Sequence, residues 1–421
     1  MTSDAPLFKT PANPVQSSAD VDSATGQSHA PYARALFEGN SGEGVAQPGR
    51  RLRREYRSPG SALRRARPTR QPELLLNVDT QIDEAGEHGE IFTRRWVVDL
   101  ILDLAGYTDD QDLAMLIAVE PACGTGAFLV PMVERLLSSC AQKGRNVATA
   151  AGALRAYDLL PANVAVSRQV VERVLRAHEV SATTAAALAG TWVTQADYLL
   201  MDHDEAADLV CGNPPYIRLE NIPPERSNSY RLACPTMGGR ADIFIGFYET
   251  GLTSLRAGGR LAFICADRWM RNSYGSALRQ LVADHYAVDV AVTMHDVDAF
   301  EEPVSAYPAI TVLRAGGQGR ALVANTTKAF GQASAEQLVK WGRSGDGEPL
   351  HREGLSAAWL AHWFASGASW PTGSPDRLAL VAYLEERFAP IEATGAKVGI
   401  GLASGADGVY ITRSADAAEP E

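Results

Sequence analysis

Short apolar runs alternate with amphipathic segments along much of this chain, and this alternation limits the folds that it can adopt. Runs with the composition of strands cover residues 115–119, 154–157, 192–193, 208–211, 260–265, 288–293 and 309–313. Helical spacing of apolar residues covers 96–104, 129–137, 164–175, 243–255 and 278–283. Strands that are separated by helices pair in parallel, so the sequence predicts an α/β fold with a mainly parallel sheet. The first helix is expected to be capped by Thr93 and to end at Gly106.

A glycine-containing loop, residues 120–126, joins the first expected strand to the next helix. Gly124 and Gly126 let the backbone approach a ligand closely, and the following helix points its N-terminus at the same place. Many nucleotide-binding folds share this signal. However, the third glycine of the dinucleotide motif is missing, and the loop opens with Glu120. A carboxylate would repel a pyrophosphate and attract an ammonium or a sulfonium, which disfavours NAD and phosphate ligands.

Two more acids follow the next expected strands. Asp158 can accept hydrogen bonds from ribose hydroxyls, and Asp197 can accept one from an adenine amine while Tyr198 stacks on the ring. Either aspartate alone is more often a helix cap or a turn residue. Three acids at three successive strand ends, where such sheets bind ligands, favour one shared nucleoside pocket.

The tetrapeptide Asn213-Pro214-Pro215-Tyr216 follows the next expected strand. One interpretation is a rigid turn that simply ends a strand, but the position of the tetrapeptide after the strand that follows Asp197 disfavours it. An aryl amine, in contrast, is a poor nucleophile because its lone pair is delocalised into the ring. The Asn213 side-chain oxygen and the Pro214 carbonyl can both accept from such an amine and draw its lone pair toward a sulfonium methyl, while Tyr216 can stack on the base. A base inside a duplex must first be flipped out.

Net charge, cysteine spacing and hydropathy limit the ligands and the cellular compartments that fit this sequence. The formal net charge is -11, which lowers the expectation of tight DNA binding by this chain alone without excluding a local basic patch. The five cysteines form no CxxC pair, which fits a reducing cytoplasm and argues against a zinc site. The sequence has neither a long uncharged apolar run nor a signal-peptide pattern, so neither a membrane span nor export is expected.

Together these motifs resemble the N6-adenine DNA methyltransferases of bacterial restriction-modification and phage-defence systems, with the gamma motif order of the type IIG kind. The resemblance covers roughly residues 77–413. It implies S-adenosylmethionine as cofactor, double-stranded DNA as partner and a Rossmann-like class I fold whose seven-stranded sheet has one antiparallel strand. The implied cofactor-binding residues are Phe92, Thr93, Glu120, Pro121, Ala122, Cys123, Gly124, Gly126, Asp158, Asp197, Tyr198, Asn213 and Asp242. The implied catalytic residues are Asn213, Pro214, Pro215 and Tyr216, and the residues implied to stack on the flipped adenine are Tyr216 and Phe300. Core packing is an equal alternative for Phe300.

The expected organisation has three parts. Residues 1–76 form a disordered, Arg-rich tail, with nine arginines between 50 and 70, that is either a solvated tail or a basic arm on phosphate. Residues 77–330 form the methyltransferase domain, and 331–421 form a linker and the truncated start of a target-recognition region, for which residues 397–407 carry the resemblance.

The sequence departs from the family pattern in two places. First, Arg94 stands where the family usually has proline. Second, the recognition region stops early, so a separate specificity subunit is a possible partner. Two alternatives stay open: a methyltransferase of the same fold that acts on RNA or on a protein glutamine, and a non-catalytic or partner-dependent DNA-binding subunit.

Overall fold

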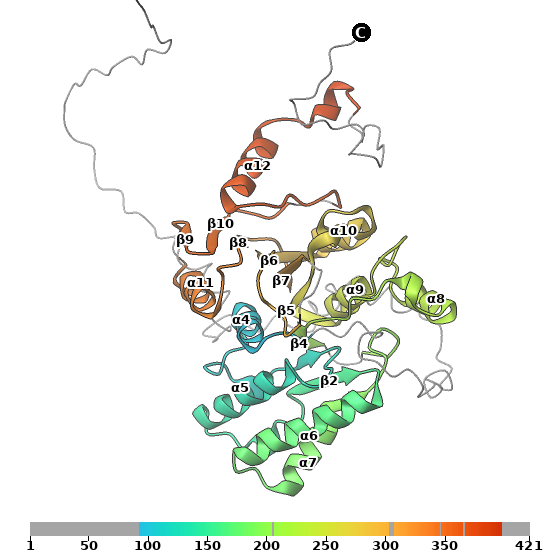
Figure 1. Ribbon diagram of the computed structural model, residues 1–421, viewed down its shortest axis with the longest axis vertical. Helices are drawn as coiled ribbons and strands as arrows, with labels where there is room; N and C mark the ends of the chain where they lie inside the picture. Colours follow the sequence, from blue (N-terminus) through green and yellow to red (C-terminus); the bar gives the residue numbers. More distant parts are fainter. Residues whose placement is uncertain (1–91, 204–205, 303–306, 346, 365–366, 398–421) are drawn as a thin grey trace, which may run out of the picture.

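The computed structural model describes residues 92–203, 206–302, 307–345, 347–364 and 367–397 (Figure 1). The expected tail 1–76, residues 77–91 and the recognition-like region after Lys397 lie outside these residues. Within them the strands are β1 (Ala118–Glu120), β2 (Leu154–Asp158), β3 (Val193–Gln195), β4 (Ala207–Gly212), β5 (Leu255–Ala266), β6 (Tyr286–Thr293), β7 (Pro308–Ala315), β8 (Ala321–Thr326), β9 (Leu350–Arg352) and β10 (Leu355–Leu360). The α-helices are α4 (Arg95–Ala105), α5 (Leu129–Gln142), α6 (Pro161–Ala177), α7 (Ala182–Trp192), α8 (Pro224–Ala233), α9 (Phe244–Ser254), α10 (Ser276–His285), α11 (Gln332–Ser344) and α12 (Pro375–Arg387).

All these strands belong to one 10-stranded sheet in the order β3-β2-β1-β4-β5-β7-β6-β8-β10-β9. The run from β3 to β6 is the expected Rossmann-like core, with parallel strands and a single antiparallel member, β7. The expectation of seven strands was wrong for the sheet as a whole. β8 pairs in parallel with β6, and the β10–β9 hairpin continues the sheet beyond β8. An antiparallel hairpin needs no crossover helix, so the helix–strand alternation did not reveal it.

Alternate residues of the central strands face opposite sides of the sheet, as the pleat requires. Leu209 and Cys211 of β4 pack in one hydrophobic core with α4, α5, α6, α7 and α11, whereas Val210 packs in a second core with α8, α9, α10 and α12. Figure 1 shows the sheet between these two groups of helices. Strands buried on both faces explain the continuous apolar runs in the sequence.

The first described helix starts later than expected. Thr93 was expected to cap it, but α4 begins at Arg95 and Thr93 instead forms an antiparallel bridge with Phe300. The other end is as expected, because Gly106 ends the helix with φ of 78° in the left-handed region. The difference matters for the site, because the bridge holds the segment before α4 over the sheet edge.

Parallel strands bring their carboxyl ends to one edge of the sheet, and the predicted motifs gather there. Glu120 ends β1, Asp158 ends β2, Asp197 lies two residues after β3 and Asn213 follows β4. Among the described residues, no helix is long and apolar enough to cross a membrane.

Candidate active site

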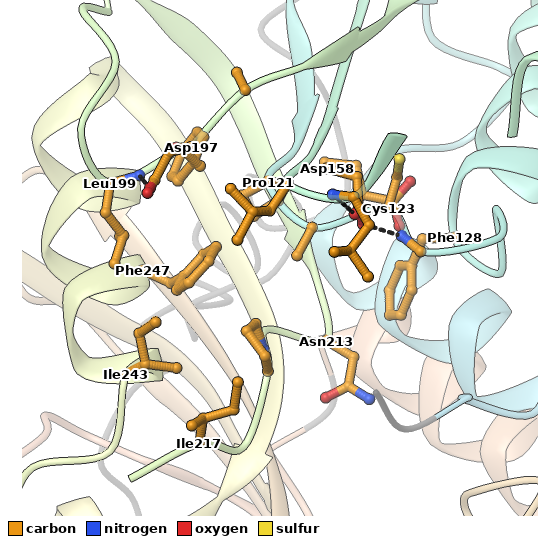
Figure 2. A pocket seen from close by; sticks show the side chains of 18 of the residues that line it. Pro121, Cys123, Phe128, Asp158, Asp197, Leu199, Asn213, Ile217, Ile243 and Phe247 are labelled. Carbon is orange, nitrogen blue, oxygen red and sulfur yellow. Dashed lines mark hydrogen bonds between the residues drawn. The ribbon is translucent and has the colours of Figure 1, made fainter. Parts of the chain in front are cut away.

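A cavity opens at the carboxyl ends of β1, β2 and β4 (Figure 2). Its empty space, including the open mouth, is about 940 Å³. The predicted site residues that line it are Phe92, Thr93, Glu120, Pro121, Ala122, Cys123, Gly124, Asp158, Asp197, Tyr198, Asn213 and Pro215. The structure therefore brings together residues that are up to 123 positions apart in the sequence, from Phe92 to Pro215.

Glu120 lies at the floor of this cavity with only 2% of its surface exposed. Burial, and then the negative charge of Asp158, raise the pKa of the Glu120 carboxyl well above its usual value. Its Oε2 atom is buried and accepts no hydrogen bond from any described residue. A buried oxygen of this kind is costly unless a ligand supplies a donor or a positive charge.

Asp158 holds the glycine-containing loop in shape. Its Oδ2 accepts a hydrogen bond from the Gly124 backbone N–H at 2.8 Å, and its Oδ1 accepts from Leu160 N at 2.8 Å and from Asn163 Nδ2 at 3.2 Å. Gly124, with φ of 49°, and Gly126, with φ of 102°, both have backbone conformations that side-chain-bearing residues rarely adopt. The two glycines are thus needed for the loop that passes over Glu120.

The third acid of the cavity, Asp197, has partners that were not predicted from the sequence. Asp197 Oδ2 accepts a hydrogen bond from the Tyr230 hydroxyl at 2.8 Å, and Oδ1 accepts from Leu199 N at 3.2 Å. Burial raises the pKa of Asp197, and the Tyr230 hydrogen bond opposes this rise. Tyr198 stacks on Phe247, with ring centroids 5.7 Å apart and an interplanar angle of 14°.

Tyr230 and Phe247 both line the cavity, yet the sequence analysis did not select them. Phe247 lies in an expected helix, where an aromatic residue has no feature that separates it from core. Tyr230 lies on α8, which the apolar pattern did not predict because that helix is largely polar. No local signal would have found either residue.

The Asn213 side chain enters the cavity from the end of β4 and is held by the segment before α4. Its Nδ2 donates a hydrogen bond to Thr93 Oγ1 at 3.2 Å. Thr93 is in turn fixed by the bridge to Phe300, by the hydrogen bond from Arg94 N to Ala299 O at 3.0 Å, and by the one from Glu301 N to Phe92 O at 2.8 Å. Because the carboxamide nitrogen of Asn213 donates to Thr93, this hydrogen bond orients the group, and the carboxamide oxygen points away from Thr93.

Five predicted site residues do not line the cavity, namely Gly126, Pro214, Tyr216, Asp242 and Phe300. Gly126 closes the turn of the loop, because its N–H donates to Cys123 O at 2.8 Å, and Pro214 is a buried residue. Tyr216 donates to Ile264 O at 3.4 Å, and burial raises the pKa of its hydroxyl well above the usual value.

Asp242 and Phe300 are neighbours of lining residues, since Asp242 precedes Ile243 and Phe300 is bridged to Thr93. The backbone of Asp242 forms an antiparallel β-bridge with that of Arg218, and the Asp242 carboxylate accepts a hydrogen bond from the Tyr274 hydroxyl at 3.4 Å. Phe300 is 5% exposed and packs in the hydrophobic core on the α4 side of the sheet, in line with the alternative of core packing. The stacking role of Phe300 stays a prediction.

Comparisons with known proteins agree with this geometry. A family model described as Eco57I restriction-modification methylase matches residues 165–300. The chain is 42% identical to the type II methyltransferase M.PaeR7I of Pseudomonas aeruginosa over 77% of its own length and 56% of the relative, and 40% identical to the type II methyltransferase M.XhoI of Xanthomonas vasicola over 77% and 60%. It thus spans little more than half the length of these relatives. The chain is thus similar to restriction-modification methylases over 77% of its length, and the family model matches part of the same stretch.

Proposed function

We propose that this protein transfers a methyl group from S-adenosylmethionine to the exocyclic N6 amine of an adenine in DNA, in the cytoplasm of a bacterium. The observation that carries the proposal is the arrangement of Asn213 and Glu120 in one cavity, with the carboxamide oriented by Thr93. Similarity to the restriction-modification methylases supports methyl transfer to DNA as the reaction.

The donor set of the cavity fits this cofactor. Glu120 offers a buried carboxylate oxygen with no donor among the described residues, which suits the positively charged part of S-adenosylmethionine. Asp197 and the Tyr198–Phe247 pair offer an acceptor and flat apolar surfaces for an adenine ring. Asp158, at the end of β2, is the acid nearest to the Gly124 backbone and would face the ribose.

The bound cofactor supplies an electrophilic methyl group, and this chain supplies the acceptors that prepare the nucleophile. The Asn213 side-chain oxygen and the Pro214 carbonyl would accept hydrogen bonds from the adenine amine and thereby hold its lone pair toward the methyl group. The hydrogen bond to Thr93 fixes the Asn213 carboxamide before substrate arrives, which lowers the entropy cost of that arrangement. Pro214 and Pro215 limit the freedom of the same loop.

The partner would be double-stranded DNA with the target adenine flipped out of the stack, because a paired base cannot reach a cavity at a sheet edge. A single experiment tests cofactor and substrate together. S-adenosylmethionine is titrated into the purified chain by calorimetry, and tritium transfer is then measured to unmethylated bacterial DNA, ribosomal RNA and total protein. We expect cofactor binding and transfer to DNA alone.

The variant Asn213→Ala separates catalysis from binding. It removes one of two acceptors for the amine, so we expect transfer to fall by about 100-fold or more, while cofactor affinity changes by less than about threefold. Equal loss of both would contradict the role of Asn213. Transfer to RNA or protein in place of DNA would overturn the substrate, and cofactor binding with no transfer to any acceptor would show that this chain does not act by itself.

A further inference from the structure

A second polar cluster lies at the same edge of the sheet, outside the cavity. Asp267 directly follows β5, His295 follows β6, and Tyr307 directly precedes β7. Because β7 is antiparallel to β5 and β6, its start lies beside their ends. The backbone N–H of Asp267 donates to Tyr307 O at 2.8 Å, which joins the cluster across two strands.

The Asp267 carboxylate is the centre of this cluster. Its Oδ1 accepts from Arg271 Nη2 at 2.7 Å, and its Oδ2 lies 2.8 Å from His295 Nε2. The Asp267 side chain is 0% exposed, whereas the side chains of Arg271 and His295 are 38% and 33% exposed. The exposed ring of Tyr307 lies 4.9 Å from the His295 ring. Solvent therefore meets the guanidinium of Arg271 and the ring of His295, while the carboxylate that orients both is buried.

The cluster is close to the catalytic loop. The Tyr216 hydroxyl donates to Ile264 O, three residues before Asp267 on the same strand path. On the other side, burial raises the pKa of Asp242, and the charges of Arg268 and Arg218 lower it, so both arginines lie near that carboxyl. Arginines thus continue along the edge from the catalytic loop to the cluster.

A fully buried carboxylate is costly unless hydrogen-bonding partners compensate it, and for Asp267 these partners are Arg271 and His295. The N–H groups of a guanidinium, and of an imidazole in its protonated form, match the oxygens of a phosphate. Phosphate contacts set the register of a duplex on a protein. With a net charge of -11, the chain needs a local arrangement of this kind to hold a polyanion.

We propose that Asp267 is a positioning residue that holds Arg271 and His295 against the phosphate backbone of DNA next to the flipped adenine. This inference rests on the proposed function, since it assumes that DNA is the substrate. Tyr307 would support the His295 ring from its outer side.

The variant Asp267→Asn gives the sharpest test, because two explanations predict opposite signs. If only net charge matters, removing one negative charge from this edge strengthens DNA binding. If Asp267 positions Arg271 and His295, the same change weakens it, by about threefold to tenfold. Binding is measured by fluorescence anisotropy with a labelled duplex at several salt concentrations, and cofactor affinity is measured in parallel.

Arg271→Gln is the second variant, since a half-exposed side chain can be changed without unfolding the protein. We expect weaker DNA binding, a salt slope that is smaller by about one, and unchanged S-adenosylmethionine affinity. The matched control is Arg145→Gln, because Arg145 is 39% exposed and also paired with an aspartate, Asp112, but lies beyond the C-terminal end of α5. The control should bind DNA like the unchanged protein.

The outcomes are distinguishable. If the unchanged protein binds DNA and Arg271→Gln or a folded Asp267→Asn binds equally well with the same salt slope, this inference is overturned and the proposed function is untouched. An equal loss in Arg145→Gln would also overturn it, because the effect would then be general. If the unchanged protein neither binds nor methylates DNA at low salt, the proposed function itself fails.

Discussion

At the scale of single residues, the carboxyl of Glu120 is the feature that most closely joins stability to function. Burial raises its pKa, so in the pH range between its unfolded and folded values the folded chain holds a proton that the unfolded chain has lost. Stability of the ligand-free protein therefore falls as pH rises through that range. A positively charged ligand has the opposite effect on the pKa of Glu120, because it favours the ionised carboxylate.

The variant Glu120→Gln should consequently have two opposite effects. Without ligand, it should unfold at a higher temperature than the unchanged protein at neutral pH, because an amide carries no charge to desolvate. Its affinity for S-adenosylmethionine should fall by about tenfold or more. Thermal unfolding and calorimetry measure the two effects, with the exposed Glu385→Gln on α12 as a control that should change neither. A Glu120→Gln protein with unchanged cofactor affinity would contradict the assigned role.

Tyr230 gives a second prediction at this scale. Its hydroxyl donates to Asp197, a carboxylate that is 5% exposed. In Tyr230→Phe the donor is lost, so the pKa of Asp197 should rise further and the folded state should lose about 1 to 3 kcal/mol. Urea unfolding measures the loss, and cofactor affinity should fall with it. Unchanged stability would mean that water replaces the hydroxyl.

At the scale of elements, the loop between β1 and α5 depends on backbone conformation. Gly124→Ala should cost about 1 to 2 kcal/mol of folding stability, because φ of 49° is unfavourable for alanine. Apart from the two chain neighbours of Gly124, no heavy atom of a described residue lies within 4 Å of the added Cβ, so the cost to the fold is one of conformation alone. However, Gly124 lines the cavity, and the methyl group should also weaken S-adenosylmethionine binding.

A matched variant separates these two effects. Gly144, just after α5, has φ of 64° and is equally open around the position of a Cβ. Gly144→Ala should lose a similar amount of stability and bind the cofactor normally. If both variants lost S-adenosylmethionine affinity to the same extent, the loss would follow from lower folding stability. Gly124 would then have no direct role in cofactor binding. Thermal unfolding and calorimetry on both proteins decide the matter.

At the scale of the whole molecule, β8, β10 and β9 make the sheet continuous past residue 330, where a domain boundary was expected. Whether 331–360 folds with the methyltransferase domain is testable with Leu360→Ala on β10, since Leu360 is 4% exposed. We expect a loss of about 2 to 5 kcal/mol. Helix content and cofactor binding should then disappear at the same, lowered urea concentration.

The control for this variant is Leu380→Ala on α12, where the leucine is 56% exposed and should contribute less than about 0.5 kcal/mol. If Leu360→Ala produced an early, separate transition with cofactor binding retained, residues after 330 would form an independent unit, as the expected domain division has it.

Local chemistry in the sequence was sufficient to predict the parallel core and most of the cavity. A strand buried on both faces is apolar throughout, a tight loop needs glycine, and a ligand at the end of a strand needs acceptors there, so Gly124, Asp158 and Asn213 are visible in short windows of sequence. Each of these signals spans fewer than ten residues, and none depends on the path of the rest of the chain.

The tertiary structure alone decided which distant residues meet. The contacts of Thr93 with Phe300 and Asn213, of Tyr230 with Asp197, and of His295 with Asp267 join residues that are 28 to 207 positions apart. Such pairs form because parallel strands bring successive loops to one edge, and sequence periodicity carries no information on which loop lies next to which. The same reason applies to the hairpin of β9 and β10, whose place at the sheet edge follows from the pairing of β8 with β6 and not from any residue of its own.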